Sequence, residues 1–246
     1  MRNQLVYDVP TRVFHWSFAG LFVTAYTIAN VAEDSLLFPF HMLAGLLLVC
    51  LVVLRTIWGV VGTRHARFRS LTLSPMALLA YVKGIFGGER RLWAGHNPAS
   101  SWTVLIMMAL AAGLGITGYL MTSGGHRETY EELHELFANA FLAVALLHIA
   151  GIVLHVLHHH DGFALSMVDG CKQGVPADET IEKPRPFMGV ALLAMLAAAG
   201  AYLLGHYDSK AQTLNLFGTP LRLGENEGAE QGERQDAGEE DDEQDD

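Results

Sequence analysis

The sequence contains little cysteine and few charged residues. Only two cysteines, Cys50 and Cys171, occur among 246 residues, which is too few for a disulfide framework. A Cys-x-x-Cys-His motif is absent, so covalent attachment of a c-type haem is excluded. Charged residues make up 17% of the chain, below the share typical of soluble domains. The sequence carries no catalytic triad, phosphate-binding loop or zinc motif, and nothing in it indicates binding to nucleic acid.

Long apolar runs are the feature that the sequence has in abundance. A helix needs about 20 mostly apolar residues to cross roughly 30 Å of hydrocarbon. Five runs approach or exceed that length: Val13–Val31, His41–Val61, Ser101–Met121, Leu133–Leu157 and Phe187–Leu204. Because a backbone in lipid must satisfy its own hydrogen bonds, these runs predict an all-α protein with five transmembrane helices.

The basic residues are concentrated in alternate loops. Lys and Arg gather in Met1–Arg12, in Thr63–Pro98 and between Lys172 and Arg185. The positive-inside rule therefore predicts a cytoplasmic N-terminus and an extracytoplasmic C-terminus. Within the long inner loop, Ser74–Phe86 is predicted to form either a short interfacial helix or a plain loop helix.

Negative charge is concentrated at the C-terminus. Of the 26 acidic residues, 12 lie in Glu225–Asp246, together with one of the 16 basic residues. This composition predicts a disordered extracytoplasmic tail over residues 207–246. Such a tail could attract a basic soluble cytochrome c, or it could be a solvated segment without a partner.

Four histidines lie inside the apolar runs or about a turn from their ends: His15, His41, His134 and His148. An ionisable side chain in a membrane span is costly and by default indicates a functional site. With the predicted orientation, His41 and His134 lie near the outer face, and His15 lies near the inner face. His148 follows His134 by 14 residues, which is roughly 21 Å along a helix and within about 40° of the same face. The sequence therefore predicts an outer pair, His41 with His134, and an inner pair, His15 with His148.

Two histidine pairs at two depths indicate two haems. Neutral imidazole is a good axial ligand for iron, and the core of a helical bundle is a usual place for a cofactor. His155, seven residues after His148 and on nearly the same face, is an alternative inner ligand that would lie closer to the headgroups. The cluster His158–His160 is interpreted as interfacial. No chemistry is assigned to the histidines in loops.

Two arginines lie near the predicted depth of the inner pair. Arg55 follows His41 by 14 residues on the same helix face, and Arg12 directly precedes the inner end of the first run. Each could bind a haem propionate through charge-assisted hydrogen bonds. The alternative is that both side chains extend to the inner headgroups.

Glycines near the histidines are predicted to provide clearance for a flat macrocycle. Gly45 and Gly151 each follow one of the four histidines by about one helical turn. The third run contains Gly113, Gly115 and Gly118, for which ordinary packing between membrane helices is the favoured explanation.

Several segments resemble the bacterial cytochrome b561 family, which includes the membrane cytochrome b subunits of nickel–iron hydrogenases. The segment Asp8–Trp16 looks like the start of that family, and His41 to Gly62, with Arg55-x-x-Trp58-Gly59, is similar to its second helix. Further similar segments are Gly95–Pro98, Thr117-Gly118, the interval from His134 to His148, and Ala164–Gly170. The resemblance covers roughly Leu5 to Gln173.

The resemblance implies a transmembrane four-helix core over residues 1–173 that binds two haem b groups through the same four histidines. It implies electron transfer between the quinone pool and a redox partner, either a soluble c-type cytochrome or a subunit of a respiratory oxidoreductase, in the bacterial inner membrane. An inner linker with the fifth helix (174–206) and the tail (207–246) lie outside this core.

Three other functions stay open at this point. The chain could be a haem-bearing anchor subunit that acts only within a hydrogenase-like complex. It could be a self-contained oxidoreductase that couples quinone to a small molecule such as superoxide. A haem-free transporter is the third possibility.

Overall fold

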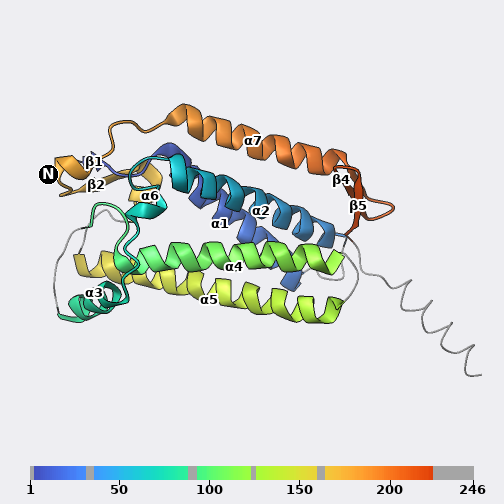
Figure 1. The fold of residues 1–246 in the computed structure, drawn as a ribbon, viewed down its shortest axis with the longest axis horizontal. Coiled ribbons are helices and arrows are strands. Elements are labelled where there is room, and N and C mark those ends of the chain that lie inside the picture. Colours follow the sequence, from blue (N-terminus) through green and yellow to red (C-terminus); the bar gives the residue numbers. More distant parts are fainter. Residues whose placement is uncertain (1–2, 32–35, 88–92, 123–125, 160–163, 224–246) are drawn as a thin grey trace, which may run out of the picture.

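The fold is a bundle of long helices with small sheets at its two ends (Figure 1). The structure is a computed structural model, and it describes residues 3–31, 36–87, 93–122, 126–159 and 164–223. The long helices are α1 (Val9–Val31), α2 (Phe38–Val61), α4 (Pro98–Thr122), α5 (Arg127–His159) and α7 (Pro186–Gly205). Each predicted apolar run lies within one of these helices, so the helical prediction is confirmed for all five. His160, the last member of the predicted interfacial cluster, lies outside the described residues.

Among the described residues, four helices are long and apolar enough to cross a membrane: α2, α4, α5 and α7. The protein is therefore a multi-pass membrane protein. Helix α1 is 23 residues long, close to the 24 residues of α2, but it is not one of the four. Its sequence includes Arg12, His15 and Asn30, which make it less apolar. Because α1 packs along α2 (Figure 1), we still expect it to cross the membrane, and that remains a prediction.

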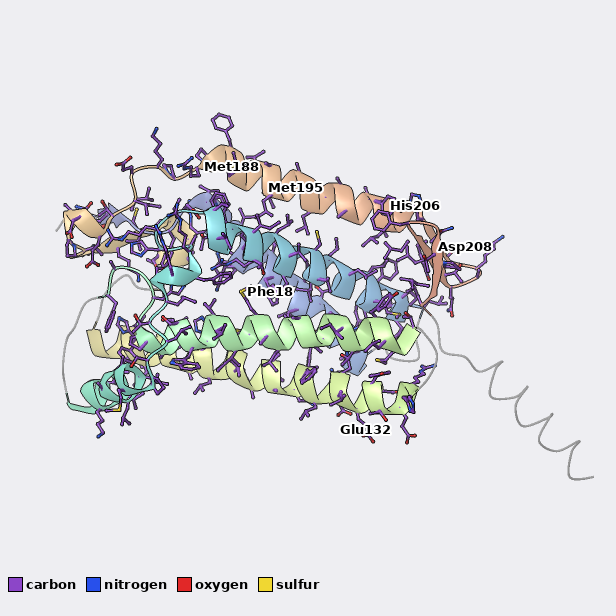
Figure 2. All side chains as sticks on the ribbon, viewed as in Figure 1. Phe18, Glu132, Met188, Met195, His206 and Asp208 are labelled. Carbon is purple, nitrogen blue, oxygen red and sulfur yellow. The ribbon has the colours of Figure 1, made fainter. Side chains whose placement is uncertain are left out.

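Helices α1, α2, α4 and α5 form the four-helix core, and α7 packs on its outside against α1 and α2 (Figure 1). Aromatic rings fill the middle of the core, where Phe22 of α1 meets Phe141 of α5 at a centroid distance of 4.2 Å. Phe18, labelled in Figure 2, stacks on the same Phe141 ring at 5.6 Å. Phe141 lies seven residues from both His134 and His148 on α5, so this cluster lies between the levels of the two predicted pairs.

One end of the bundle, called here the N-terminal end, gathers the first residues of the chain and the loops that follow α2 and α5. Strand β1 (Asn3–Leu5) pairs antiparallel with β2 (Cys171–Gln173), and the Val6 and Tyr7 amides donate to the Gly170 carbonyl. Gly170 has a φ of 84°, which favours glycine. The short helices at this end are η1 (Phe68–Ser70), α3 (Pro75–Gly87), α6 (Ser166–Asp169) and η2 (Ala177–Glu179).

Helix α3 confirms that the Ser74–Phe86 segment is helical. It packs against α4 and leaves Met76, Leu79 and Val82 exposed. These apolar side chains suit a helix at a membrane surface, although its interfacial position remains a prediction.

The opposite end carries a small sheet that corrects the predicted start of the tail. Strands β3 (Tyr207–Asp208), β4 (Thr213–Leu216) and β5 (Thr219–Arg222) pair antiparallel in that order. Leu214, Leu221 and Leu223 pack with Leu43 of α2 and Leu203 of α7. Residues 207–223 therefore belong to the folded body, because their leucines are buried against two helices. The acidic tail that remains, 224–246, lies outside the described residues.

Candidate functional site

The outer histidine pair comes from α2 and α5. The rings of His41 and His134 lie with their centroids 6.1 Å apart and their planes at 70°. Both residues are half-buried within the bundle. The two side chains that the sequence predicted to share one depth are therefore direct neighbours.

Hydrogen bonds fix which ring nitrogen of each outer histidine carries its proton. His41 Nδ1 lies 2.8 Å from the carbonyl oxygen of Ala25, which can only accept, so Nδ1–H donates. His134 Nδ1 lies 2.9 Å from Thr117 Oγ1, and this hydroxyl donates to the Gly113 carbonyl at 2.9 Å. The hydroxyl proton is thus used, and His134 Nδ1–H donates to the oxygen. In both rings Nε2 keeps its lone pair, the state that a metal ligand requires.

The separation of the rings fits a shared metal ion. A metal bound at about 2 Å to one nitrogen of each of two rings would place the ring centroids about 6 Å apart. The observed 6.1 Å matches this spacing. His41 and His134 are therefore the residues that would hold a haem iron at this level.

The glycines near the two histidine pairs differ in what surrounds them. A Cβ at half-buried Gly45 would meet nothing within 4 Å, which agrees with the predicted clearance. A Cβ at Gly113 would come within 2.8 Å of Phe137, which supports the packing explanation there. At Gly118 it would lie 3.4 Å from the His134 ring, an ordinary van der Waals contact, so the histidine does not require a glycine there. Gly151 is exposed, and its open surroundings do not distinguish a cofactor space from the outside of the bundle.

The inner pair joins α1 to α5. His15 and His148 interact electrostatically, which places them near one another. In the described part of the chain, the buried His15 Nδ1 atom has no hydrogen-bond partner. His155 lies two turns beyond His148 and is also half-buried. Because His148 is the electrostatic neighbour of His15, the structure favours His148 as the inner ligand, and the assignment remains a prediction.

Both predicted arginines lie at this inner level with part of the guanidinium unpaired. Among the described residues, the buried atoms Arg12 Nε and Arg55 Nη1 have no hydrogen-bond partner. Arg12 Nη1 donates to the Val168 carbonyl, and the Arg55 guanidinium lies 5.3 Å from the centre of the Phe68 ring. Buried donors are rarely left unpaired in native proteins, so these atoms fit the carboxylates of a haem propionate better than a simple extension into headgroups.

Asp8 is a buried residue of this region to which sequence reasoning gave no role. Its carboxylate is fully buried and accepts from the Thr11 amide at 2.8 Å, which caps the N-terminus of α1. It also accepts from Trp58 Nε1 at 3.1 Å and Thr63 Oγ1 at 2.8 Å. Asp8 interacts electrostatically with Arg55 and so links the start of α1 to the end of α2. The sequence did offer a signal for the helix cap, because Asp8 stands two positions before Pro10 at the start of α1.

A second group missed from the sequence surrounds His96, in the loop before α4. This half-buried side chain has electrostatic contacts with Arg55, Lys172, His65 and His148, which connect it to the inner level. Burial lowers the pKa of His96 to about 3, so its ring is neutral at pH 7. Lys172 is buried beside it and donates to the Gly95 carbonyl at 3.0 Å. Nothing in the spacing of these residues could have grouped them, because they come from two loops, strand β2 and helices α2 and α5.

Outer-pair partners were also missed. The carbonyl of Ala25 carries no residue-specific signal, so the sequence could not have identified it. Thr117 was noted only as part of a Thr-Gly motif, although its hydroxyl orients His134.

Comparisons with known proteins identify the family of the chain. The family model described as prokaryotic cytochrome b561 matches residues 6–170. A probable Ni/Fe-hydrogenase B-type cytochrome subunit from Rhizobium leguminosarum bv. viciae is 28% identical over 167 residues, which cover 55% of this chain. The match spans 66% of that relative, slightly less than two thirds of its length. No solved structure matches the chain. The family model covers more than half of the chain and includes all four paired histidines, and the chain therefore belongs to the prokaryotic cytochrome b561 family.

Proposed function

We propose that this cytochrome transfers electrons across the membrane with two haem b groups, one bound by His41 and His134 and the other by His15 and His148. The observation that carries the proposal is the outer pair, whose 6.1 Å ring separation and Nδ1 hydrogen bonds prepare both Nε2 atoms as ligands. When bound, haem b supplies a one-electron redox centre at each level.

The surrounding residues hold the ligands and separate the two sites. Ala25 and Thr117 keep the outer imidazoles in the required tautomer, which is the usual role of groups behind a metal ligand. The Phe22 and Phe141 rings fill the core between the two levels and exclude water from it. Arg12 and Arg55 would bind the propionates of the inner haem through their unpaired nitrogens.

The charge at the two ends of the bundle supports the proposed orientation. The N-terminal end carries Arg64, Arg67 and Arg69. Figure 2 shows Glu132 and Asp208 at the opposite end. The positive-inside rule then places the N-terminal end in the cytoplasm and the β3–β5 sheet outside the bacterial inner membrane.

We propose that one of the two sites exchanges electrons with the quinone pool and the other with a redox partner protein. The name of the hydrogenase cytochrome relative supports a second candidate, in which the chain is a membrane anchor subunit for hydrogenase-like subunits. The two candidates differ in whether the isolated chain reacts with quinol.

Anaerobic mixing of the purified full-length chain with a quinol, in lipid nanodiscs, tests the function. We expect bis-histidine b-type absorption bands, two haems per chain, and reduction of haem without any added protein. A chain that contains haem but is not reduced by quinol would favour the anchor-subunit function. Purified protein without haem would contradict both candidates.

The acidic tail supports a further part of the proposal, concerning the partner. Twelve carboxylates in Glu225–Asp246 could steer a basic soluble c-type cytochrome to the outer end of the bundle. Deletion of this segment should slow electron exchange with such a cytochrome by about tenfold at low salt and have little effect at high salt. Stopped-flow spectroscopy measures both rates, and unchanged rates at low salt would contradict a steering role.

A further inference from the structure

A basic cavity of about 820 Å³ lies at the N-terminal end of the bundle, and its lining includes none of the four paired histidines. Its lining comes from the loop after α2, the segment before α4 and the η2 segment. The charged and titratable side chains of this lining are Arg64, His65, Arg67, Arg69, His96 and Glu179.

The lining favours an anion. Burial lowers the pKa of both His65 and His96, so both rings are neutral at pH 7. Three arginines then outnumber the single carboxylate of Glu179. His65 Nε2 lies 2.6 Å from the Glu179 carbonyl and donates to it, which holds the η2 segment against the cavity.

The three arginines are positioned differently. Arg67 Nε donates to the Gly62 carbonyl at 2.6 Å, and Arg64 Nη1 donates to the Asp178 carbonyl. Each guanidinium has five N–H donors, so both arginines retain donors after these bonds. Arg69 is exposed and, within the described ranges, makes no hydrogen bond or ion pair. A planar guanidinium is well matched to the oxygens of a phosphate group.

An apolar helix adjoins the cavity. Tyr81 of α3 meets the lining residue Trp93 edge to face, with ring centroids 6.5 Å apart. Asn97, at the start of α4, donates to the Tyr81 hydroxyl at 2.8 Å and fixes α3 beside the cavity. Outward from this contact, Met76 is 74% exposed and Leu79 is 49% exposed. A basic site next to exposed apolar side chains suits a molecule with an anionic head and hydrocarbon chains.

We propose that this cavity binds the phosphate headgroup of an anionic phospholipid, whose acyl chains lie against α3. The arginines bind the phosphate oxygens, and the exposed face of α3 enters the same leaflet. Basic pockets at membrane-protein surfaces are a recurrent way of holding such lipids. This site is separate from the proposed electron transfer, and either proposal can fail without the other.

Native mass spectrometry of the delipidated full-length protein in detergent tests the proposal. Cardiolipin and phosphatidylglycerol are the anionic probes, and phosphatidylcholine and inorganic phosphate are titrated in parallel. We expect saturable binding of an anionic lipid that is at least fivefold tighter than binding of phosphatidylcholine. Arg69→Gln should weaken anionic-lipid binding about three- to tenfold, and the double variant with Arg64→Gln should weaken it further.

Lys183→Gln is the matched control, since it removes one positive charge from an exposed residue at the same end but outside the cavity. The haem spectrum of each variant reports whether the bundle has folded. An equal loss of lipid binding in Lys183→Gln would reduce the effect to general surface charge and overturn the proposal. Inorganic phosphate that bound as tightly as the lipids would overturn the lipid assignment. Unchanged lipid binding in both arginine variants would also overturn the lipid assignment. An acidic segment of a partner protein would then be the alternative occupant of the cavity.

Discussion

The two histidine pairs differ in what surrounds them. At the outer pair, both Nδ1 atoms already have protein acceptors, Ala25 and Thr117. At the inner pair, the described part of the structure leaves buried atoms of His15, Arg12 and Arg55 without partners. The outer histidines are thus oriented by the protein alone. The polar atoms at the inner pair instead need hydrogen-bond partners, which a haem with its propionates would supply.

Charge makes the second difference between the sites. The inner level has cationic side chains and the buried carboxylate of Asp8 close by, whereas the outer histidines donate hydrogen bonds to neutral groups. We therefore expect hydrogen bonding to control the haem affinity of the outer site, and electrostatics to control the haem potential of the inner site. The predictions that follow test this division.

Removing a ligand has the largest expected effect. His41→Ala and His134→Ala should each lose the same haem, and His15→Ala and His148→Ala should each lose the other, so that haem content falls by about half. The reason is that a bis-histidine site loses one of its two axial bonds. Pyridine haemochrome quantitation and reduced-minus-oxidised spectra measure the loss.

His155→Ala serves as the control for the inner ligand. It should retain both haems, because the neighbour of His15 is His148. Retention of both haems by His148→Ala, together with the loss of one by His155→Ala, would show that the inner pair is assigned wrongly.

Thr117→Val should weaken the outer site without removing a ligand. His134 Nδ1–H would lose its acceptor, and loss of a group behind a metal ligand typically costs about 10- to 100-fold in affinity. Thr117→Ser should retain the affinity, since its hydroxyl can accept the same bond. Haem titration of the apoprotein gives the values.

Thr103→Val is the matched control for Thr117→Val on α4. Thr103 Oγ1 makes the same kind of bond to a carbonyl four residues earlier, Ala99, but it contacts neither histidine pair. An equal loss of outer haem in both valine variants would attribute the effect to helix packing rather than to orientation of His134.

Much of the helical architecture could be predicted from the sequence because the membrane imposes it. Long apolar runs can satisfy their backbone only as helices, and each predicted run lies within a helix. The β3–β5 sheet was missed because its strands have two to four residues, too short for a clear period. Only its packing on α2 and α7 shows that Leu214 and Leu221 are core residues.

The candidate site was predictable to a smaller extent. Helix geometry placed His134 and His148 on one face, and the outer ring contact agrees with the depth argument for His41. The roles of Thr117 and Asp8 were not predicted, because each depends on a partner from another helix. Thr117 contacts His134, 17 positions along the chain, and Asp8 contacts Trp58, about 50 positions along it. Periodicity describes one helix at a time and does not show which residues face one another across a bundle.

Arg55 provides the finest test of the difference between the sites. Arg55→Gln removes a positive charge at the inner level and leaves the negative charge of Asp8 uncompensated. Both changes disfavour addition of an electron, so the inner haem potential should fall by on the order of 60 mV, a tenfold change in a one-electron equilibrium. The outer haem is the internal control, and its potential should stay nearly constant.

Arg55→Lys keeps the charge and should restore most of the inner potential. Redox titration in nanodiscs separates the two haems. An equal shift of both haems, or no recovery with lysine, would show that Arg55 acts through packing against Phe68 rather than through its charge.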